Sequence, residues 1–260
     1  MGTYFFMINT FPILITSAIK PPENFPALAM QDSDIRKAAT KASIYFWVAQ
    51  GAKELVIVDS TATDVLNSED LELFKRLGVH LEHITFTQDN EKVRTLGLGY
   101  AEGNLLKYGV ENSELISKKG SFFKCTGKVF CRNFADIFDL VVSKKISNLF
   151  WQRFPSSPDL VETRFFFCSL DSFHRNILPC YLNSDTKNII EADLAKVLGS
   201  QLNRANEIRP LLTGFSGGPG NQYFGGRGYL YEEKAYGDLD SHFPCWFNTI
   251  SGAPKLGVYL

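Results

Sequence analysis

Short apolar runs and amphipathic segments alternate along the first half of the chain. The runs at residues 12–17, 55–58 and 122–130 are rich in β-branched and aromatic residues, which predicts buried strands. Residues 79–87 alternate between apolar and polar side chains, as expected for a strand with one face in the core. The pattern predicts four strands of one sheet.

Amphipathic segments with helix signals lie between these strands. The Asp32-Ser33-Asp34 segment is a capping sequence, and the apolar positions of residues 35–48 then recur at helical spacing. Residues 68–77 form a shorter amphipathic segment that stops at Gly78, and residues 92–108 form a longer one. Strands that alternate with helices predict an α/β fold with a mostly parallel sheet flanked by helices.

The second half of the chain is less regular. We expect strands at residues 149–154 and 162–169, separated by a turn at residues 155–159. A helix capped by one of residues 170–172 should reach residue 178, and another should cover residues 188–202. Many glycines follow from residue 214 onward. The chain length suits one compact domain with two halves, residues 1–135 and residues 136–260.

Composition excludes several classes of protein. The net charge of -1 provides no basic field, so no nucleic-acid partner is expected. Five cysteines without CxxC spacing lie in apolar segments, which indicates reduced core thiols in a cytoplasmic protein.

Membrane insertion is not expected. Residues 1–17 carry no cationic region before their apolar run, so we interpret them as a first strand instead of a signal peptide. Uninterrupted apolar windows long enough for a spanning helix are missing from the sequence. The aromatic segment 243–247 leaves peripheral contact with the inner face of the cytoplasmic membrane as an alternative, although aromatic packing in the core is the favoured explanation.

Two strand ends carry the residues best suited to binding chemistry. Lys124, Thr126, Gly127 and Lys128 lie within or after the fourth strand, and cations beside a glycine suit a phosphate. The second strand ends in Asp59-Ser60-Thr61, and a carboxylate at the carboxyl end of a parallel strand commonly binds a ribose. Together they predict a site for a nucleoside joined to a diphosphate.

The order of these parts resembles the glycosyltransferase-A architecture, in which a nucleotide sugar lies across the carboxyl ends of the N-terminal strands. The resemblance implies that Thr16 and Ser17 lie near the base and that Asp59 contacts the nucleoside. It also implies that a helix containing residues 97–104 packs under the diphosphate. Residues 1–135 would then bind the nucleotide sugar, and residues 136–260 would bind the acceptor and supply a glycine-rich tail.

A narrower resemblance, over about residues 12–200, is to bacterial transferases of capsule and lipopolysaccharide O-antigen synthesis, which carry a similar Lys-x-Thr-Gly-Arg segment. It rests on Arg36 with Thr40 and Ser43-Ile44, on Asp59-Ser60, and on residues 123–128 with Asn133. It implies a nucleotide-sugar donor, with a UDP-hexose expected, and a glycan or lipid-linked acceptor. The implied donor-binding residues are Thr16, Ser17, Arg36, Asp59, Ser60, Lys124, Thr126, Gly127 and Lys128.

The fourth strand departs from the metal-dependent members of that architecture, which end this strand in an Asp-x-Asp motif. Here Lys124-Cys-Thr-Gly-Lys128 stands in its place, which favours neutralisation of the diphosphate by lysine and arginine. Asp238 and Asp240, in the glycine-rich tail, are a second Asp-x-Asp candidate. No cofactor is firmly implied, and a divalent metal is the less favoured alternative.

Three carboxylates in the second half are candidates for the base that activates an acceptor hydroxyl. Glu191 begins a predicted helix and is the first choice, and Glu162 and Asp159 are its rivals. Glu191 also suits a structural role, because an acid in the first turn complements the helix dipole.

Structural roles are open for other candidates, since Asp59 could cap a helix and Lys128 and Arg132 could be surface charges. A non-catalytic nucleotide- or glycan-binding module is therefore the alternative to an enzyme. A dehydrogenase or methyltransferase is a weaker third hypothesis, because no G-x-G-x-x-G follows the first strand.

Overall fold

The computed structural model describes residues 11–22, 30–154, 157–185, 189–199, 208–215 and 230–232. These residues form an α/β fold with a mostly parallel sheet flanked by helices, which confirms the predicted fold class. The second Asp-x-Asp candidate, the aromatic segment 243–247 and most of the glycine-dense region lie outside the described residues.

The central sheet has the strand order β3-β2-β1-β4-β9-β6. Strands β3, β2, β1 and β4 are mutually parallel, whereas β9 runs antiparallel to β4 and to β6. The strand bounds are β1 (Ile13–Ser17), β2 (Glu54–Asp59), β3 (His80–Thr85), β4 (Ser121–Thr126), β6 (Asn148–Leu149) and β9 (Phe165–Ser169).

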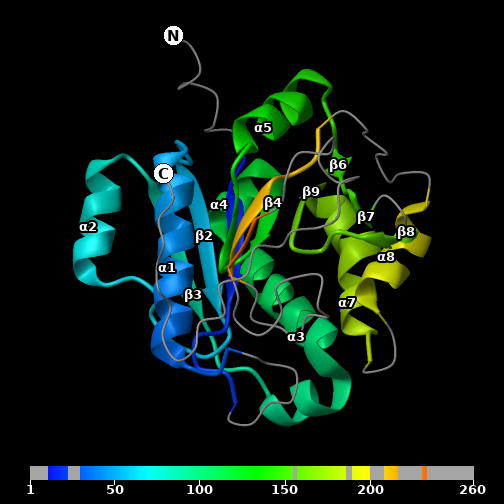
Figure 1. The fold of residues 1–260 in the computed structure, drawn as a ribbon, viewed down its shortest axis with the longest axis horizontal. Helices are drawn as coiled ribbons and strands as arrows, with labels where there is room; N and C mark the ends of the chain where they lie inside the picture. The colour runs from blue at the N-terminus through cyan, green and yellow to red at the C-terminus, as the bar shows by residue number, and fades with distance from the viewer. Residues whose placement is uncertain are drawn as a thin grey trace.

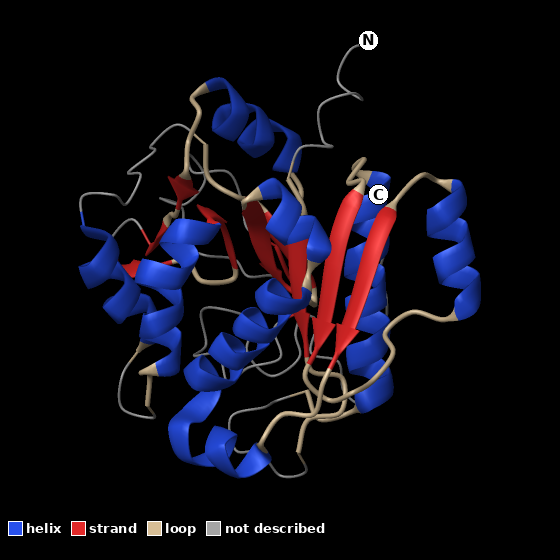
Figure 2. Ribbon diagram, turned by 180° about the vertical axis from the view of Figure 1, so that it is seen from behind, coloured by secondary structure: helices blue, strands red, loops and turns tan. Residues whose placement is uncertain are grey.

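Helices cover both faces of this sheet, as Figures 1 and 2 show. Side chains of β1 alternate between two cores: Ile13 and Ile15 face one and Leu14 faces the other. The first core is closed by α1 (Ser33–Ala49), α2 (Ser68–Arg76) and α5 (Phe134–Ser143). The second is closed by α3 (Asn90–Asn112), α4 (Glu114–Lys119), α6 (Leu170–Ser172), the π-helix η2 (Phe173–Ile177), α7 (Leu178–Leu182) and α8 (Ile190–Leu198).

Side-chain caps fix the starts of α1 and α2, and the cap at Asp32 was predicted from the sequence. The Asp32 side chain accepts hydrogen bonds from the backbone N–H groups of Asp34 and Ile35, so α1 begins at Ser33. Asn67 and Asp70 form a reciprocal capping box at the start of α2. Gly78 follows α2 with a φ of 68°, a conformation that glycine adopts readily.

The predicted fourth strand, residues 122–130, is wrong as one continuous element. The chain turns at Gly127 and Lys128 and separates β4 from β5 (Val129–Cys131). Strand β5 leaves the central sheet and pairs with β10 (Leu212–Phe215), which in turn pairs with β11 (Leu230–Glu232). The turn forms because the Gly127 N–H donates to the Thr16 carbonyl at 2.7 Å.

Several predictions for the second half also need correction. The predicted strand 149–154 is divided between β6 and β7 (Gln152–Phe154), and most of the predicted turn at 155–159 belongs to β8 (Ser157–Val161). Pairing with β7 in an isolated two-stranded sheet stabilises β8, where an edge position tolerates Pro158. Strand β9 begins at Phe165 instead of residue 162, and the cap of α6 is Ser169 instead of one of residues 170–172. Helix α8 ends at Leu198.

Within the described ranges, the helices are too short or too polar to cross a bilayer. The cysteines found there, Cys125, Cys131, Cys168 and Cys180, are free thiols, and the first three are buried.

Candidate functional site

The direction in which strands are added reverses beside β1. The chain proceeds from β1 outward through β2 and β3, and then returns to place β4 on the other side of β1. Ligands of open α/β sheets bind at the carboxyl edge of such a switch point. At this edge Thr16 of β1 lies next to Thr126 of β4, and a cavity of about 310 Å³ opens above them.

The cavity combines cations, hydroxyl groups and apolar surface. Its charged side chains are Arg36, Lys128, Arg164 and Glu102. Its neutral polar side chains are Thr16, Ser17, Ser60, Thr61, Gln88, Asn90 and Thr126. Its remaining walls come from Ala18, Pro21, Pro22, Val93, Leu98, Ala101, Leu105, Val129 and Phe215.

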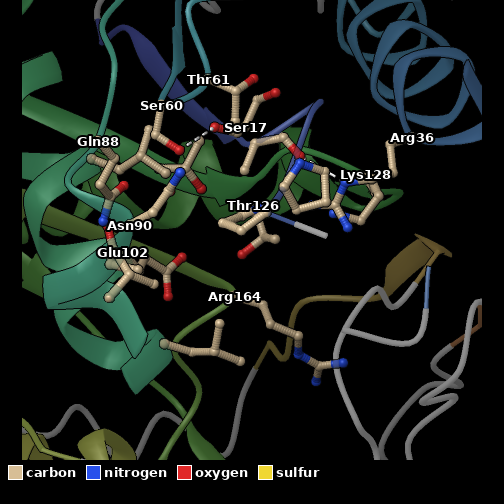
Figure 3. Close-up of a pocket in the computed structure, with 18 of the residues that line it drawn as sticks. Ser17, Arg36, Ser60, Thr61, Gln88, Asn90, Glu102, Thr126, Lys128 and Arg164 are labelled. Atoms are coloured by element: carbon tan, nitrogen blue, oxygen red, sulfur yellow. Dashed lines mark hydrogen bonds between the residues drawn. The ribbon is translucent and has the colours of Figure 1, made fainter. Parts of the chain in front are cut away.

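The charged groups are segregated within the cavity. Figure 3 shows Arg36 and Lys128 on one side, and Gln88, Asn90 and Glu102 on the opposite side. Arg164 lies on a third side, apart from the other two groups. An elongated ligand with an anionic part and a hydroxylated part would match this division.

Lys128 is held by a turn that is fixed on several sides. A Cβ atom at position 127 would lie 2.3 Å from the Thr16 carbonyl oxygen, so only glycine allows this approach. The Lys128 carbonyl accepts a hydrogen bond from the Phe215 N–H at 2.9 Å. The Val129 carbonyl accepts one from Ser43 Oγ at 2.7 Å. The turn therefore presents Lys128 to the cavity from a defined backbone.

Arg36 and Lys128 form the cationic side of the cavity. Arg36 is buried, and its guanidinium donates to the carbonyls of Ala18 at 2.6 Å and Met30 at 3.0 Å. Burial lowers the pKa of Arg36 to about 10, although Asp59 acts to raise it. Burial, and then the charge of Arg36, lower the pKa of Lys128 to about 7 against the opposing effect of Glu102 and Asp59. Among the described residues, neither cation forms an ion pair with a carboxylate, which favours an anionic ligand.

Glu162, one of the predicted bases, holds Arg164 at the cavity wall. Its Oε1 accepts hydrogen bonds from Arg164 Nε at 2.7 Å and from the Arg164 backbone N–H at 2.9 Å, and its Oε2 contacts Nη2. Burial acts to raise the pKa of Glu162, but Arg164, with Arg153, outweighs it and lowers the pKa to about 2. A carboxylate with such a low pKa is a weak base, so the geometry favours a positioning role.

Asp59 lies beneath the cavity and not among its lining residues. It is fully buried, and its Oδ2 accepts from Ser17 Oγ at 2.6 Å and from the Ile19 N–H at 3.0 Å. Its Oδ1 accepts from Thr61 Oγ1, the Thr61 N–H and the Thr63 N–H. The carboxylate thus joins the loops that follow β1 and β2.

Lys124 also lies behind the cavity wall. It is fully buried, and its ammonium donates to Glu102 Oε1 at 2.5 Å, to the Thr163 carbonyl at 2.6 Å and to Thr126 Oγ1 at 3.1 Å. Because an ammonium group has only three N–H bonds, these partners use all of them.

The other two predicted bases do not line the cavity. Glu191 accepts from Arg153 Nη1 at 2.5 Å and from Thr163 Oγ1 at 3.4 Å. Asp159 is exposed on β8. Arg153 acts on both Glu162 and Glu191, and Thr163 joins Glu191 to the Lys124 network.

The sequence analysis did not predict Glu102, Gln88, Asn90 or Arg164 as site residues. Gln88 and Asn90 follow a parallel strand, so the rule that located Asp59 could have found them. Arg164 reaches the same edge because it immediately precedes a strand that runs antiparallel to β4, and its carbonyl accepts from the Thr126 N–H at 2.9 Å. The sequence pattern does not indicate whether a strand runs parallel or antiparallel to its neighbour.

In the part of the chain that the structure describes, no three His, Cys, Asp or Glu side chains gather as metal ligands. The predicted neutralising cations Arg36 and Lys128 both line the cavity.

No family model matches the chain, and no curated protein matches it. A solved structure described as a glucose-1-phosphate thymidylyltransferase from Bacillus anthracis, in complex with a sucrose, shares 11% identity at a TM-score of 0.41 and covers 78% of this chain and 89% of its own. A glycosyltransferase involved in glycosylation of the major capsid of PBCV-1 shares 12% identity at a TM-score of 0.38, covering 75% and 78%. Core-mannan synthase A from Aspergillus fumigatus, in a Mn/GDP form, shares 9% identity at 0.37, covering 75% and 71%. These likenesses are remote, so the function is argued from the site itself.

Proposed function

We propose that this chain is a glycosyltransferase that binds a nucleotide sugar in the switch-point cavity and transfers the sugar to a hydroxyl group of a glycan or lipid-linked acceptor. The observation that carries the proposal is the convergence of Arg36, Lys128 and Arg164 beside the strand-end hydroxyl groups of β1, β2 and β4. A UDP-hexose as donor and surface polysaccharide synthesis as the setting extend the proposal from the sequence resemblance.

The cationic side suits the diphosphate of such a donor. Charge-assisted hydrogen bonds from lysine and arginine to phosphate oxygens are about twice as strong as neutral ones. When the sugar leaves, the nucleoside diphosphate gains negative charge, and cations already in place stabilise that charge without reorganisation. Lys128 is the most direct candidate, because the turn at the end of β4 presents it to the cavity.

The nucleoside would occupy the ends of β1 and β2. Ser17, Ser60 and Thr61 offer hydroxyl groups for the ribose, and Pro21 and Pro22 offer apolar surface for a base. We assign Asp59 to holding these loops, because its oxygens accept their hydrogen bonds. Its predicted contact with the nucleoside would then be indirect.

The C-terminal half contributes Arg164 and Phe215 to the cavity and would also bind the acceptor. Glu191 stays our candidate for the acceptor-side base, since Thr163 joins its carboxylate to the network at the end of β4. To act as a base it would have to separate from Arg153 in the acceptor complex. The weaker alternatives are Glu162, which Arg164 holds, and the exposed Asp159.

A non-catalytic nucleotide- or glycan-binding module is the second candidate function. The pairing of Glu162 and Glu191 with arginines favours it, because a carboxylate in an ion pair is a weak proton acceptor. Hydrolysis of the donor without an acceptor would distinguish the enzyme, since a binding module would bind the nucleotide sugar without consuming it.

Calorimetry with a panel of nucleoside diphosphates and nucleotide sugars tests the proposal. We expect one nucleotide to bind the wild-type protein and Lys128→Ala to weaken it by about tenfold to a hundredfold, the equivalent of about 1.5–3 kcal/mol for a charged hydrogen bond. Lys107→Ala, at an exposed lysine of α3, is the control. If no nucleotide binds the wild-type protein, or if a folded Lys128→Ala variant binds unchanged, the proposed site is wrong.

A further inference from the structure

Glu102 is an acidic side chain that faces the predominantly cationic cavity. It belongs to the segment of α3 after Gly97, where a φ of 89° bends the helix. Its neighbour Gly103 packs so closely on α7 that a Cβ atom would lie 2.5 Å from the Tyr181 Cβ. Glu102 itself is 25% exposed and lines the cavity, and Figure 3 shows its carboxylate extending toward the space between Thr126 and Arg164.

The buried Lys124 fixes the orientation of this carboxylate. All three N–H bonds of Lys124 are used within the protein, one of them for Glu102 Oε1. Lys124 therefore has no donor left for a ligand, and its contact holds Glu102 Oε1 in place. An ion pair made by a buried lysine is weak evidence for added stability, so we interpret this pair as orienting Glu102 for binding.

The second oxygen of Glu102 is available to a ligand. Among the described residues no group donates a hydrogen bond to Oε2, whereas Oε1 receives the Lys124 ammonium. A carboxylate repels phosphate but accepts hydrogen bonds strongly from hydroxyl groups. Gln88 lies on the same side of the cavity (Figure 3) and is oriented by donating to the Ala101 carbonyl at 3.2 Å. This side therefore suits a polyhydroxylated group.

We propose that Glu102 is a specificity-determining residue whose Oε2 accepts a hydrogen bond from a hydroxyl group of the sugar in the donor, with Lys124 as its positioning residue. This inference rests on the proposed function. The diphosphate would lie on the side of Arg36 and Lys128, and the sugar on the side of Glu102. A ligand without a hydroxyl group at this position would remove water from the carboxylate and leave Oε2 without a hydrogen bond, which costs binding free energy. The site would therefore bind a sugar in preference to such a ligand.

Comparing the affinity for the nucleotide sugar with the affinity for the free nucleoside diphosphate distinguishes a contact with the sugar from a contact with the rest of the donor. We expect Glu102→Gln to weaken the nucleotide sugar by about tenfold to a hundredfold, the usual effect of losing a charged hydrogen bond. Affinity for the free nucleoside diphosphate should stay the same or increase, because a negative charge is removed. Glu111→Gln, at an exposed glutamate of the same helix, should change neither affinity.

Donors lacking single hydroxyl groups identify the contact. One deoxy donor should lack the hydroxyl group that contacts Glu102. Its affinity for the wild-type protein should be as low as the affinity of the complete donor for the Glu102→Gln variant. The same deoxy donor should lose little further affinity in the variant. Equal losses in wild type and variant for every deoxy donor would overturn the contact.

Two variants test Lys124 and guard against misfolding. Lys124→Met should reduce the preference for nucleotide sugar over nucleoside diphosphate about as much as Glu102→Gln does. The double variant Glu102→Gln/Lys124→Met leaves no unpaired buried charge, and it should retain the fold and show the same reduced preference. A folded double variant with the wild-type preference would overturn the inference while leaving the proposed function intact. Failure of the wild-type protein to bind any nucleotide would overturn both.

Discussion

At the scale of single residues, Lys128 carries the clearest physical signature of the site. Its ammonium lies in a partly desolvated turn beside the buried Arg36, and burial followed by that charge lowers its pKa to about 7. Bound phosphate would favour the protonated lysine and raise its pKa again. Proton uptake and anion binding at this residue are therefore linked.

We expect nucleotide affinity to decrease as the pH rises above about 7, by at most about tenfold per pH unit, because binding must then protonate Lys128. Calorimetry between pH 7 and pH 9, where a nucleoside diphosphate is already ionised, measures this slope. Lys128→Arg is the matched control, since arginine stays charged and its profile should be flat. Parallel profiles in the two proteins would contradict the assignment.

The same lowered pKa predicts an effect on the ligand-free protein. The unfolded chain binds the Lys128 proton up to pH about 10.5, whereas the folded chain releases it near pH 7. Between these values the unfolded state binds more protons, so this group makes the free energy of unfolding rise with pH. Below pH 7 Lys128 is protonated in both states, and its charge lowers the free energy of unfolding by the full amount.

Lys128→Met should therefore raise the midpoint of urea denaturation at pH 6, and the gain should shrink as the pH approaches 10. Lys107→Met, at an exposed lysine, should show no such trend. A gain that is independent of pH would indicate improved packing instead of a removed charge.

At the scale of elements, the Asp59 carboxylate is the link between the loops after β1 and β2. It accepts hydrogen bonds from Ser17 at the end of β1 and Ile19 just after it, and from Thr61 and Thr63 after β2. Each buried donor that loses its acceptor costs about 1–3 kcal/mol. The loops contribute Ser17, Ser60 and Thr61 to the cavity, so stability and binding depend on the same link.

Asp59→Ala should lower the free energy of unfolding by about 3–5 kcal/mol, because several buried donors are left unsatisfied at once. Urea denaturation measures the loss, and nucleotide affinity should fall with it. Asp64→Ala, in the same segment but with a carboxylate that is 81% exposed, is the control. If Asp59→Ala were as stable as the control and yet failed to bind nucleotide, Asp59 would contact the nucleoside directly, as the sequence suggested.

At the scale of the whole molecule, both halves of the chain form one sheet and one cavity. Strands β6 and β9 from the second half extend the sheet begun by β1 to β4, and Arg164 and Phe215 complete the cavity wall. A ligand bound there would contact both halves, so it should stabilise the described fold as a unit.

Nucleotide at about 100 times its Kd should add about 2.7 kcal/mol to the free energy of unfolding and raise the Tm. We expect this gain to persist in EDTA, because Arg36, Lys128 and Arg164 already supply positive charge at the site. Thermal denaturation with and without EDTA checks it. Complete loss of the gain, restored by manganese, would reveal a metal site, and Asp238 and Asp240 would be the first residues to replace.

The sequence by itself determined the repeated strand and helix pattern of the first half and the polar chemistry at two strand ends. It did so because periodicity, capping residues such as Asp32 and β-branched runs act over a few neighbouring residues. Ser60 was predicted from its place at a strand end, Thr126 and Lys128 from the segment with cations beside a glycine, and Thr16, Ser17 and Arg36 from the family resemblance. All of these residues line the cavity.

Only the tertiary structure decided which of these side chains line the cavity. Asp59 and Lys124 looked like binding residues, yet their partners lie up to 42 and 39 residues away in the sequence and hold them beneath the cavity. Glu102 and Arg164 take the exposed places, because α3 packs beside β4 and β9 runs antiparallel to it. Strand order, strand direction and contacts between distant residues set these positions, and no local pattern of residues encodes them.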